Sequence, residues 1–187
     1  MTDSSGPDAG FRLLDEQLHY EGYAFKVFDT TWQGPAGEVF HRDVVRHIGA
    51  VAIVPVTDDG HVLMVRQFRT SLGHSLLELP AGLRDVAGES DLDTARRELE
   101  EEVGHRAGSI EHLVTLATAV GFTNETITVF LATDLVPTEA RADGIEELTM
   151  TVERVALSDV DELIGSGVLT DAKSIAGLLV ARQRMQG

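Results

Sequence analysis

Residues 97–104 read Arg-Glu-Leu-Glu-Glu-Glu-Val-Gly, and they end a segment that has the periodicity of an amphipathic helix. Apolar residues recur within 91–103 at three- and four-residue steps, which predicts a helix over this range. These residues are Leu92, Ala95, Leu99 and Val103. Ser90 or Asp91 can cap the start of the helix, and Gly104 can end it.

The helix carries a cluster of carboxylates. An α-helix turns by about 100° per residue, so Glu98, Glu101 and Glu102 share one face while Glu100 points elsewhere. Three like charges at this spacing repel one another, and a hard divalent cation such as Mg²⁺ would relieve the repulsion. The alternative is a solvated acidic face. The spacing alone does not choose between a metal site and such a surface.

The remaining sequence indicates an α+β protein. Residues 11–47 mix aromatic and alternating polar residues, which predicts short antiparallel strands with a turn at 34–37. Further strands are expected at 48–56 (buried), 61–68, 76–79, 112–119, 126–132 and 148–157, and further helices at 159–164 and 172–184. Strands, one helix, more strands and then helices favour a mixed or antiparallel sheet over a regular βαβ alternation.

Composition bounds the function classes. The chain has 187 residues, a formal net charge of −16 and no cysteine, which excludes disulfides and thiolate chemistry. The excess of acidic residues argues against nonspecific nucleic-acid binding, because an acidic surface repels the phosphate backbone. No apolar run is long enough for a membrane span, and residues 1–10 lack the features of a secretory signal. We therefore expect a frayed polar tail at 1–10 and a cytoplasmic protein.

A longer pattern surrounds the acidic helix. Leu79-Pro80-Ala81-Gly82 precedes Gly88-Glu89, seven residues follow, and then comes the 97–104 stretch. This closely resembles the Nudix box: Gly, five residues, Glu, seven residues, Arg-Glu, an aliphatic, any residue, Glu-Glu, any residue and Gly, then an aliphatic. There are two departures. Six residues rather than five separate Gly82 from Glu89, and His105 occupies the final aliphatic position. Neither departure moves the carboxylates on the helix.

The resemblance implies a fold and a metal site. The fold would be a Nudix-type α/β/α sandwich with a mixed sheet at 48–187, with N-terminal antiparallel strands at 11–47 that form a homodimer. Glu98, Glu101, Glu102 and the Ala81 backbone carbonyl would bind Mg²⁺, with Mn²⁺ as a substitute. Arg97 and Glu89 would orient these ligands through charge-assisted hydrogen bonds. Gly82 and Gly88 would let the loop turn tightly.

Within the Nudix proteins, the chain looks most like the ADP-ribose pyrophosphatases. The segments that carry this likeness are 42–51, 65–69, 78–82 and 120–125, with Asp43 where Glu is usual and Val120 where Pro is usual. The likeness implies a nucleotide substrate and contacts from Arg42, Asp43, Arg69, Leu83, Gly121, Phe122 and Glu125. The charged members could instead be ordinary surface residues. Phe25, Phe28 or Trp32 could stack on an adenine, although core packing is the better expectation for any one of them.

The implied reaction is attack of water on one phosphorus of the pyrophosphate, so that ADP-ribose gives AMP and ribose 5-phosphate. The general base would come from the acidic loop at 137–147, with Glu146 as first choice, also as a further metal ligand, and Glu147 as second. Two alternatives remain: the same fold acting on a nucleotide sugar or dinucleotide, or a non-catalytic ligand sensor. Intact glutamates and the lack of room for a DNA-binding module argue against the sensor.

Overall fold

The computed structural model describes residues 10–138 and 149–186, which fall into two compact units. One unit is residues up to Ile48 together with Ala117–Glu125, and the other is Gly49–Leu116 together with Thr126 onward. Each unit is described by itself. No helix in the two described ranges has the length and apolar character needed to cross a bilayer.

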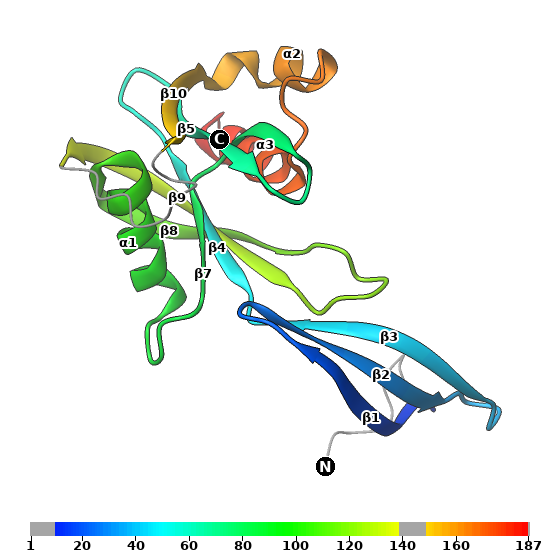
Figure 1. Ribbon diagram of the computed structural model, residues 1–187. Coiled ribbons are helices and arrows are strands. Elements are labelled where there is room, and N and C mark those ends of the chain that lie inside the picture. The colour runs from blue at the N-terminus through cyan, green and yellow to red at the C-terminus, as the bar shows by residue number, and fades with distance from the viewer. Residues whose placement is uncertain (1–9, 139–148, 187) are drawn as a thin grey trace. The chain divides into compact units, whose positions relative to one another are not determined.

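The first unit is built on three consecutive antiparallel strands, β1 (Arg12–Glu21), β2 (Phe25–Gln33) and β3 (Val39–His47), paired in that order (Figure 1). The predicted turn at 34–37 is present, and the Gly37 N–H donates to the Gly34 carbonyl. The strands have 10, 9 and 9 residues, so the expectation of short strands was wrong. The segment 117–125 attaches to β3, because the Val45 N–H donates to the Phe122 carbonyl over 2.7 Å.

The second unit contains two sheets. The four-stranded sheet has the order β7 (Ala81–Leu83), β4 (Ala50–Pro55), β9 (Thr126–Pro137) and β8 (His105–Ala117). Strand β4 runs parallel to β9 and antiparallel to β7, so this sheet is mixed. The three-stranded sheet has the order β10 (Thr151–Ala156), β5 (His61–Arg69) and β6 (His74–Glu78), and it is antiparallel.

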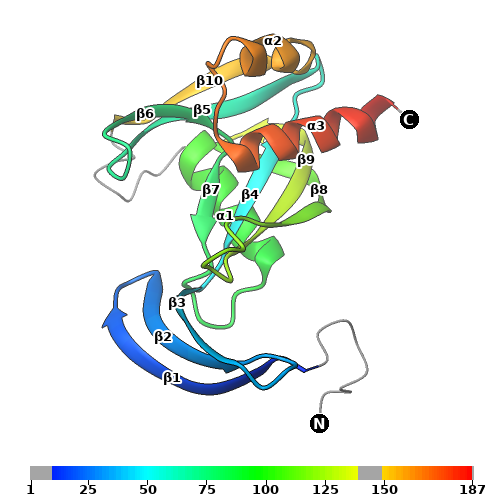
Figure 2. The same ribbon diagram turned by 90° about the vertical axis from the view of Figure 1, so that its right-hand side faces the viewer.

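Strand β4 lies between two hydrophobic cores, and all six of its residues are buried. Successive side chains of a strand point to opposite faces. Val51 and Ile53 pack with helix α1 (Asp91–Val103), whereas Ala52 and Val54 pack with helix α3 (Ala172–Gln186). Helices α1 and α3 therefore cover opposite faces of the mixed sheet (Figure 2). The continuous apolar run of β4 follows from burial on both faces.

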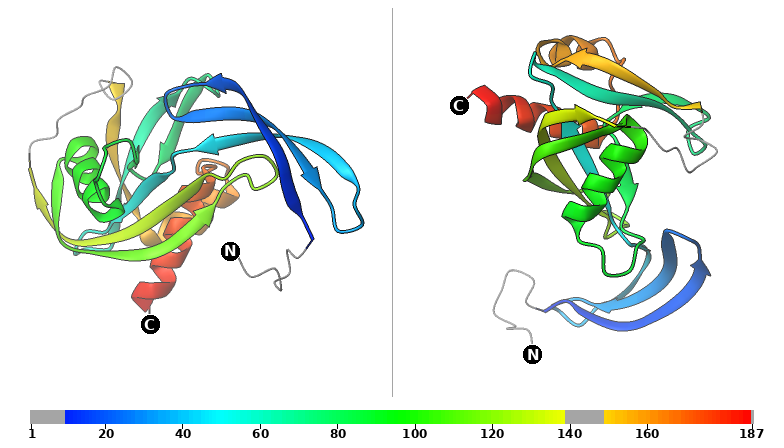
Figure 3. Two further views of the ribbon diagram at one scale, coloured as in Figure 1. Left: turned by 90° about the horizontal axis from the view of Figure 1, so that it is seen from below. Right: turned by 90° about the vertical axis from the view of Figure 1, so that its left-hand side faces the viewer.

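After β10, a 3₁₀ turn (Leu157–Asp159) and helix α2 (Val160–Gly165) pack against the α3 core through Leu157 and Val160. The views in Figure 3 show α1 and α3 separated by the sheet. The predicted α+β fold with a mixed sheet and separate N-terminal antiparallel strands is confirmed.

Element bounds agree with prediction to different degrees. Helix α1 begins and ends at the predicted residues, and α3 begins at the predicted residue. Strand β8 begins at His105 rather than at 112, and β9 continues to Pro137 rather than ending at 132. The extra residues are half-buried or exposed, and no apolar alternation in the sequence marks them as strand.

Candidate active site

Helix α1 presents the acidic cluster, and both of its ends are capped. The Ser90 side chain accepts a hydrogen bond from the Asp93 N–H, and Gly104 adopts the left-handed conformation with φ of 67°. The apolar stripe that faces β4 places Glu98 and Glu102 at the edge of the core, where they are only 8% and 5% exposed. The sequence therefore buries two carboxylates one helical turn apart, which requires compensation by positive charge or hydrogen-bond donors.

Arg97 supplies the positive charge. Its Nη1 donates to Glu98 Oε1 at 2.6 Å and to Glu101 Oε2 at 2.9 Å. Its Nε and Nη2 each donate to Glu89 at 3.3 Å. Burial opposes the charged form, but the hydrogen bonds to Glu89 and the charges of Glu98 and Glu101 raise the pKa of Arg97 above its ordinary value. One guanidinium thus holds three carboxylates, the arrangement that the Nudix resemblance implied for Glu89 and Arg97.

Thr94 is a member of this site that the sequence reasoning missed. Its Oγ1 donates to Glu89 Oε2 at 2.9 Å and to the Ser90 carbonyl at 3.1 Å, and the residue is 1% exposed. Its position three residues before Arg97 places it near the same partner. A threonine in the first turn of a helix has no sequence signal of its own, because such residues commonly bond to the local backbone.

The loop before α1 meets the carboxylates through strand β7. The Ala81 N–H donates to Glu102 Oε2 at 3.0 Å. At Gly82 an added Cβ would lie 1.9 Å from Glu98 Oε1, so glycine here makes space for a carboxylate. The expectation that Gly82 serves a tight turn is corrected, because its φ is not positive. Gly88 has a φ of 83°, in the region that favours glycine, as a tight turn requires.

These groups fit a divalent cation. Glu98 and Glu102 are buried carboxylates beside the backbone of Ala81 and Gly82. Glu98 occupies the space that a side chain at position 82 would need. In the described ranges, no three His, Cys, Asp or Glu side chains converge as a closed cage. Mg²⁺ does not need one, since it binds through one or two carboxylates and keeps waters and substrate phosphates. Glu146 and Glu147, the predicted bases, lie outside the described residues.

Arg69 lies near this cluster but has a protein partner. Its Nε and Nη2 donate to the two oxygens of Glu78 at 2.7 Å each, a bidentate pair. The hydrogen bonds to Glu78 raise the pKa of Arg69, and the charge of Glu102 contributes to the same shift. Arg69 therefore stays cationic within the electrostatic reach of Glu102. Leu83, another predicted substrate contact, is half-buried on β7 opposite Ala50.

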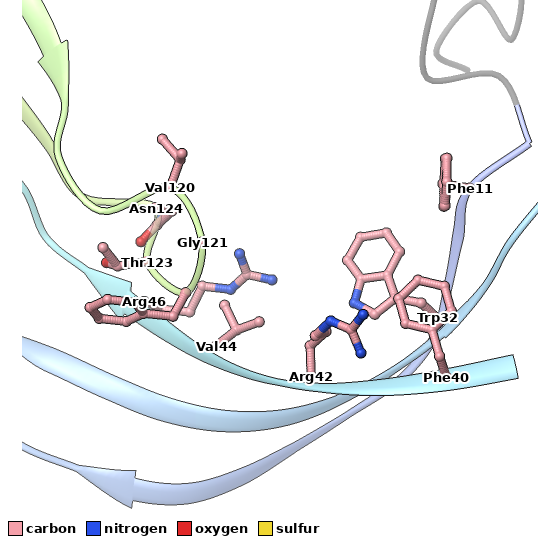
Figure 4. Close-up of a pocket in the computed structure, with 11 residues that line it drawn as sticks. Phe11, Trp32, Phe40, Arg42, Val44, Arg46, Val120, Gly121, Thr123 and Asn124 are labelled. Carbon is pink, nitrogen blue, oxygen red and sulfur yellow. The ribbon is translucent and has the colours of Figure 1, made fainter.

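The first unit holds a pocket of about 360 Å³ that is rich in aromatic and cationic side chains (Figure 4). Arg42 lies with its guanidinium 4.8 Å from the centre of the Phe40 ring. Trp32 lines the pocket, while Phe25 and Phe28 do not. The predicted contacts Arg42, Gly121 and Phe122 also line it.

Two other predicted contacts, Asp43 and Glu125, do not line this pocket. Asp43 follows Arg42 on β3, and neighbouring side chains of a strand point to opposite faces. Glu125 accepts a hydrogen bond from Thr118 Oγ1 at 2.6 Å, and His47 Nδ1 lies 3.5 Å from its other oxygen.

Some residues that line the pocket were missed from the sequence; they are Phe11, Phe40, Val44, Arg46, Val120, Thr123 and Asn124. Four lining residues of β3 recur at every second position, namely Phe40, Arg42, Val44 and Arg46. This alternation was readable once β3 was known to be one strand through 39–47. The likeness of segment 120–125 to a substrate loop predicted Gly121 and Phe122, whereas the contribution of Phe11 depends on the tertiary fold and has no local signal.

Comparison with known proteins identifies the family. Residues 46–177 match the NUDIX domain family. The chain is 39% identical to the ADP-ribose pyrophosphatase of Mycobacterium tuberculosis, over 90% of this chain and 82% of that protein. It is also 39% identical to the ADP-ribose pyrophosphatase of Bacillus subtilis, over 87% of this chain and 86% of that protein. A crystal structure of an ADP compounds hydrolase superposes with a TM-score of 0.84 at 24% identity, over 98% of both chains. These matches establish that the chain belongs to the Nudix hydrolase family, and the buried glutamates and the Arg97 hydrogen bonds agree with that assignment.

Proposed function

We propose that this protein hydrolyses ADP-ribose to AMP and ribose 5-phosphate in a Mg²⁺-dependent reaction. The observation that carries the proposal is the buried pair Glu98 and Glu102, held by Arg97 and the Ala81 N–H. The two ADP-ribose pyrophosphatase relatives support the choice of substrate.

The roles of the residues are those that the Nudix resemblance implies, and the contacts of Arg97 agree with them. Glu98, Glu101, Glu102 and the Ala81 carbonyl would hold the cation, with Mn²⁺ as a substitute. When bound, a divalent cation polarises phosphoryl oxygens and lowers the pKa of a bound water. Arg97 holds the carboxylates in place, because it donates to Glu98 and Glu101 while Glu89 fixes its far side. Arg69 adds positive charge near Glu102, where a phosphate would gain from it.

The base remains assigned to Glu146, with Glu147 as the alternative, from the sequence. Phosphoryl transfer depends chiefly on positioning and charge neutralisation. We therefore expect removal of either loop carboxylate to slow turnover while metal binding by α1 persists.

The pocket of the first unit supports a nucleotide ligand. It combines aromatic rings with two guanidinium groups, those of Arg42 and Arg46, which suits a base and an anion. Trp32 is the only tryptophan of the chain and lines this pocket. Titration with AMP should therefore quench its fluorescence, and Arg42→Ala should weaken the quenching. Unchanged fluorescence at saturating AMP would remove the pocket from the proposal.

A homodimer is also proposed, through the N-terminal strands. Apolar side chains on β1 are unusually exposed, among them Leu13, Leu18 and Tyr20 at 40%, 46% and 56%. A second copy of the same sheet would cover them. Light scattering should give twice the chain mass, and Leu18→Glu should shift the protein to the monomer mass. A wild-type monomer at micromolar concentration would contradict this.

The substrate assignment is tested with a panel of ADP-ribose, nucleotide sugars, NADH and diadenosine polyphosphates with Mg²⁺. We expect ADP-ribose to have the highest kcat/KM and to give AMP and ribose 5-phosphate by chromatography. Equal turnover of all compounds would exclude ADP-ribose specificity, and preference for another compound would reassign the substrate. Binding without any turnover would identify a sensor.

The metal site is tested by Glu102→Gln, with Glu100→Gln as the matched control on the same helix. Glu100 accepts hydrogen bonds from Arg106, whereas Glu98 and Glu101 accept hydrogen bonds from Arg97. We expect Glu102→Gln to lower kcat by about a hundredfold or more, since even groups that only orient a metal ligand matter up to that level. Circular dichroism should show a retained fold. Normal hydrolysis by Glu102→Gln would show that the metal assignment is wrong.

A further inference from the structure

The start of helix α3 is held by a group of polar side chains from its own first turn. The Asp171 carboxylate, directly before the helix, accepts hydrogen bonds from the Ser174 N–H at 3.0 Å and from Ser174 Oγ at 2.5 Å. Lys173 Nζ donates to the same carboxylate at 2.9 Å. Asp171 thus caps the helix and fixes the orientation of both neighbouring side chains.

Ser174 also contacts Leu79, which lies just before strand β7 and the carboxylates of α1. Its Oγ accepts a hydrogen bond from the Leu79 N–H at 2.7 Å, and both residues are almost fully buried. A hydroxyl both donates and accepts, so Ser174 can bond to Asp171 and Leu79 together. Without the hydroxyl, the Leu79 N–H would be a buried donor with no partner, which is costly.

Lys173 holds Glu78, the residue before Leu79. Its Nζ donates to the Glu78 carboxylate, whose other contacts are the two hydrogen bonds from Arg69. The Glu78 side chain is 3% exposed. A carboxylate this buried is stable only with such partners. Glu78 and Leu79 are therefore both fixed by residues of α3.

The segment is fixed on its other sides as well. The Pro80 carbonyl accepts from the Ile53 N–H at 2.9 Å, and the Ala81 N–H donates to Glu102 at 3.0 Å. Pro80 has no N–H to donate. In residues 79–81, the Leu79 N–H donates to Ser174 of α3 and the Ala81 N–H donates to Glu102 of α1. The direction of the Ala81 carbonyl is thus set by restraints at both ends of a three-residue segment.

We propose that Ser174, oriented by Asp171 and assisted by Lys173, is a positioning residue for the metal site. It would act through Leu79 to hold the backbone of Ala81, whose N–H donates to Glu102, in place beside the carboxylates of α1. The inference rests on the proposed metal-dependent function. Apolar packing of α3 would be served as well by alanine at this site, whereas the polar contacts serve the backbone of the loop.

The test is Mn²⁺ binding to the protein without substrate, followed by the electron paramagnetic resonance signal of free Mn²⁺. We expect Ser174→Ala to weaken Mn²⁺ binding by about tenfold, the lower end of the range for groups that orient metal ligands. The turnover of Ser174→Ala should be below that of the wild type at low Mg²⁺ and should recover at saturating Mg²⁺. Its KM for ADP-ribose should be unchanged. Lys173→Met, which keeps an unbranched buried chain, is a second variant and should weaken binding in the same direction.

Ala181→Gly is the matched control. It lies two turns further along α3, is fully buried and contacts no part of the loop by hydrogen bonds. Loss of helix propensity should destabilise it by an amount similar to that of Ser174→Ala, with Mn²⁺ affinity unchanged. Equal weakening in Ala181→Gly, or wild-type affinity in both Ser174→Ala and Lys173→Met, would overturn the inference.

Glu102→Gln separates this inference from the proposed function. If Glu102→Gln abolishes Mn²⁺ binding while the α3 variants bind normally, only the positioning role fails. If the wild-type protein does not bind Mn²⁺, or Glu102→Gln binds it normally, the metal site itself is wrong and the positioning role fails with it.

Discussion

Gly82→Ala should disable the metal site without unfolding the protein. Gly82 pairs with Val51 in the sheet, and its backbone is not in the left-handed region, so alanine is conformationally allowed. The obstacle is space, since the new Cβ would lie 1.9 Å from Glu98 Oε1 and 2.0 Å from Cδ. Ordinary contact begins at 3.4 Å, so the carboxylate must retreat by roughly 1.5 Å.

That displacement is large on the scale of metal coordination. Mg²⁺–oxygen distances are about 2.0–2.1 Å with narrow tolerance, so a ligand moved by this amount no longer binds. Misplacement of about 1 Å can cost a hundredfold in rate. We therefore expect kcat/KM to fall by at least about a hundredfold, equivalent to about 2.7 kcal/mol of transition-state stabilisation.

Stability should respond differently. Replacing glycine by alanine restricts the unfolded chain and contributes about 0.4–1 kcal/mol to the folded state, which offsets part of the strain at Glu98. The free energy of unfolding in urea should stay within about 1 kcal/mol of the wild type. Mn²⁺ titration of the variant should show weakened binding.

Gly165→Ala is the matched control for this substitution. Gly165 ends helix α2, and no heavy atom lies within 4 Å of its added Cβ. This variant should keep wild-type kcat/KM and Mn²⁺ affinity. If Gly82→Ala keeps them too, Glu98 either moves without consequence or does not bind the cation, and the reasoning is refuted.

Three further perturbations have defined outcomes. Arg97→Lys keeps the charge but loses the planar fork that holds three carboxylates, so half-maximal activity should need about tenfold more Mg²⁺; an unchanged Mg²⁺ requirement would contradict this. Gly104→Ala forces a side chain into φ of 67° and should lower the free energy of unfolding in urea by about 1 kcal/mol; an unchanged urea midpoint would argue against strain there. Burial opposes ionisation of Glu78, but Arg69 and Lys173 hold its pKa below the ordinary 4.5. Its stabilising effect is thus fully present above about pH 4.5 and is lost as the pH falls through the lowered pKa. Glu78→Gln should therefore flatten the loss of urea stability below about pH 4.5, and parallel wild-type and variant curves would refute this.

The parts of the fold that follow from short-range chemistry could be predicted. Helix α1 has a serine cap, a regular apolar stripe and a terminal glycine, and all three are local signals. The buried run of β4 likewise indicated a strand covered on both faces. The start of β8 could not be predicted, because His105–Glu111 has no alternation of apolar residues and is paired only through the tertiary fold.

The candidate site divides in the same way. The face shared by Glu98, Glu101 and Glu102 follows from helix geometry, and Arg97 lies four residues before Glu101 on that helix. The partner of Arg69 could not be read from the sequence, because the contact with Glu78 depends on the register of β5 and β6. Ser174 is 95 residues from Leu79 along the chain, and a serine in an amphipathic helix carries no signal for such a partner.

The separation of Leu79 from its hydroxyl partner also has a consequence for protein synthesis. A ribosome that has released the chain through β9 has already made the acidic helix and the two parallel strands of the central sheet. Translation at about 5–20 residues per second delivers Ser174 roughly two to seven seconds later. During that interval the nascent chain carries every carboxylate of the α1 cluster while the Leu79 N–H lacks its acceptor. The loop that precedes α1 is therefore secured late in translation, by a helix made after the sheet that it covers.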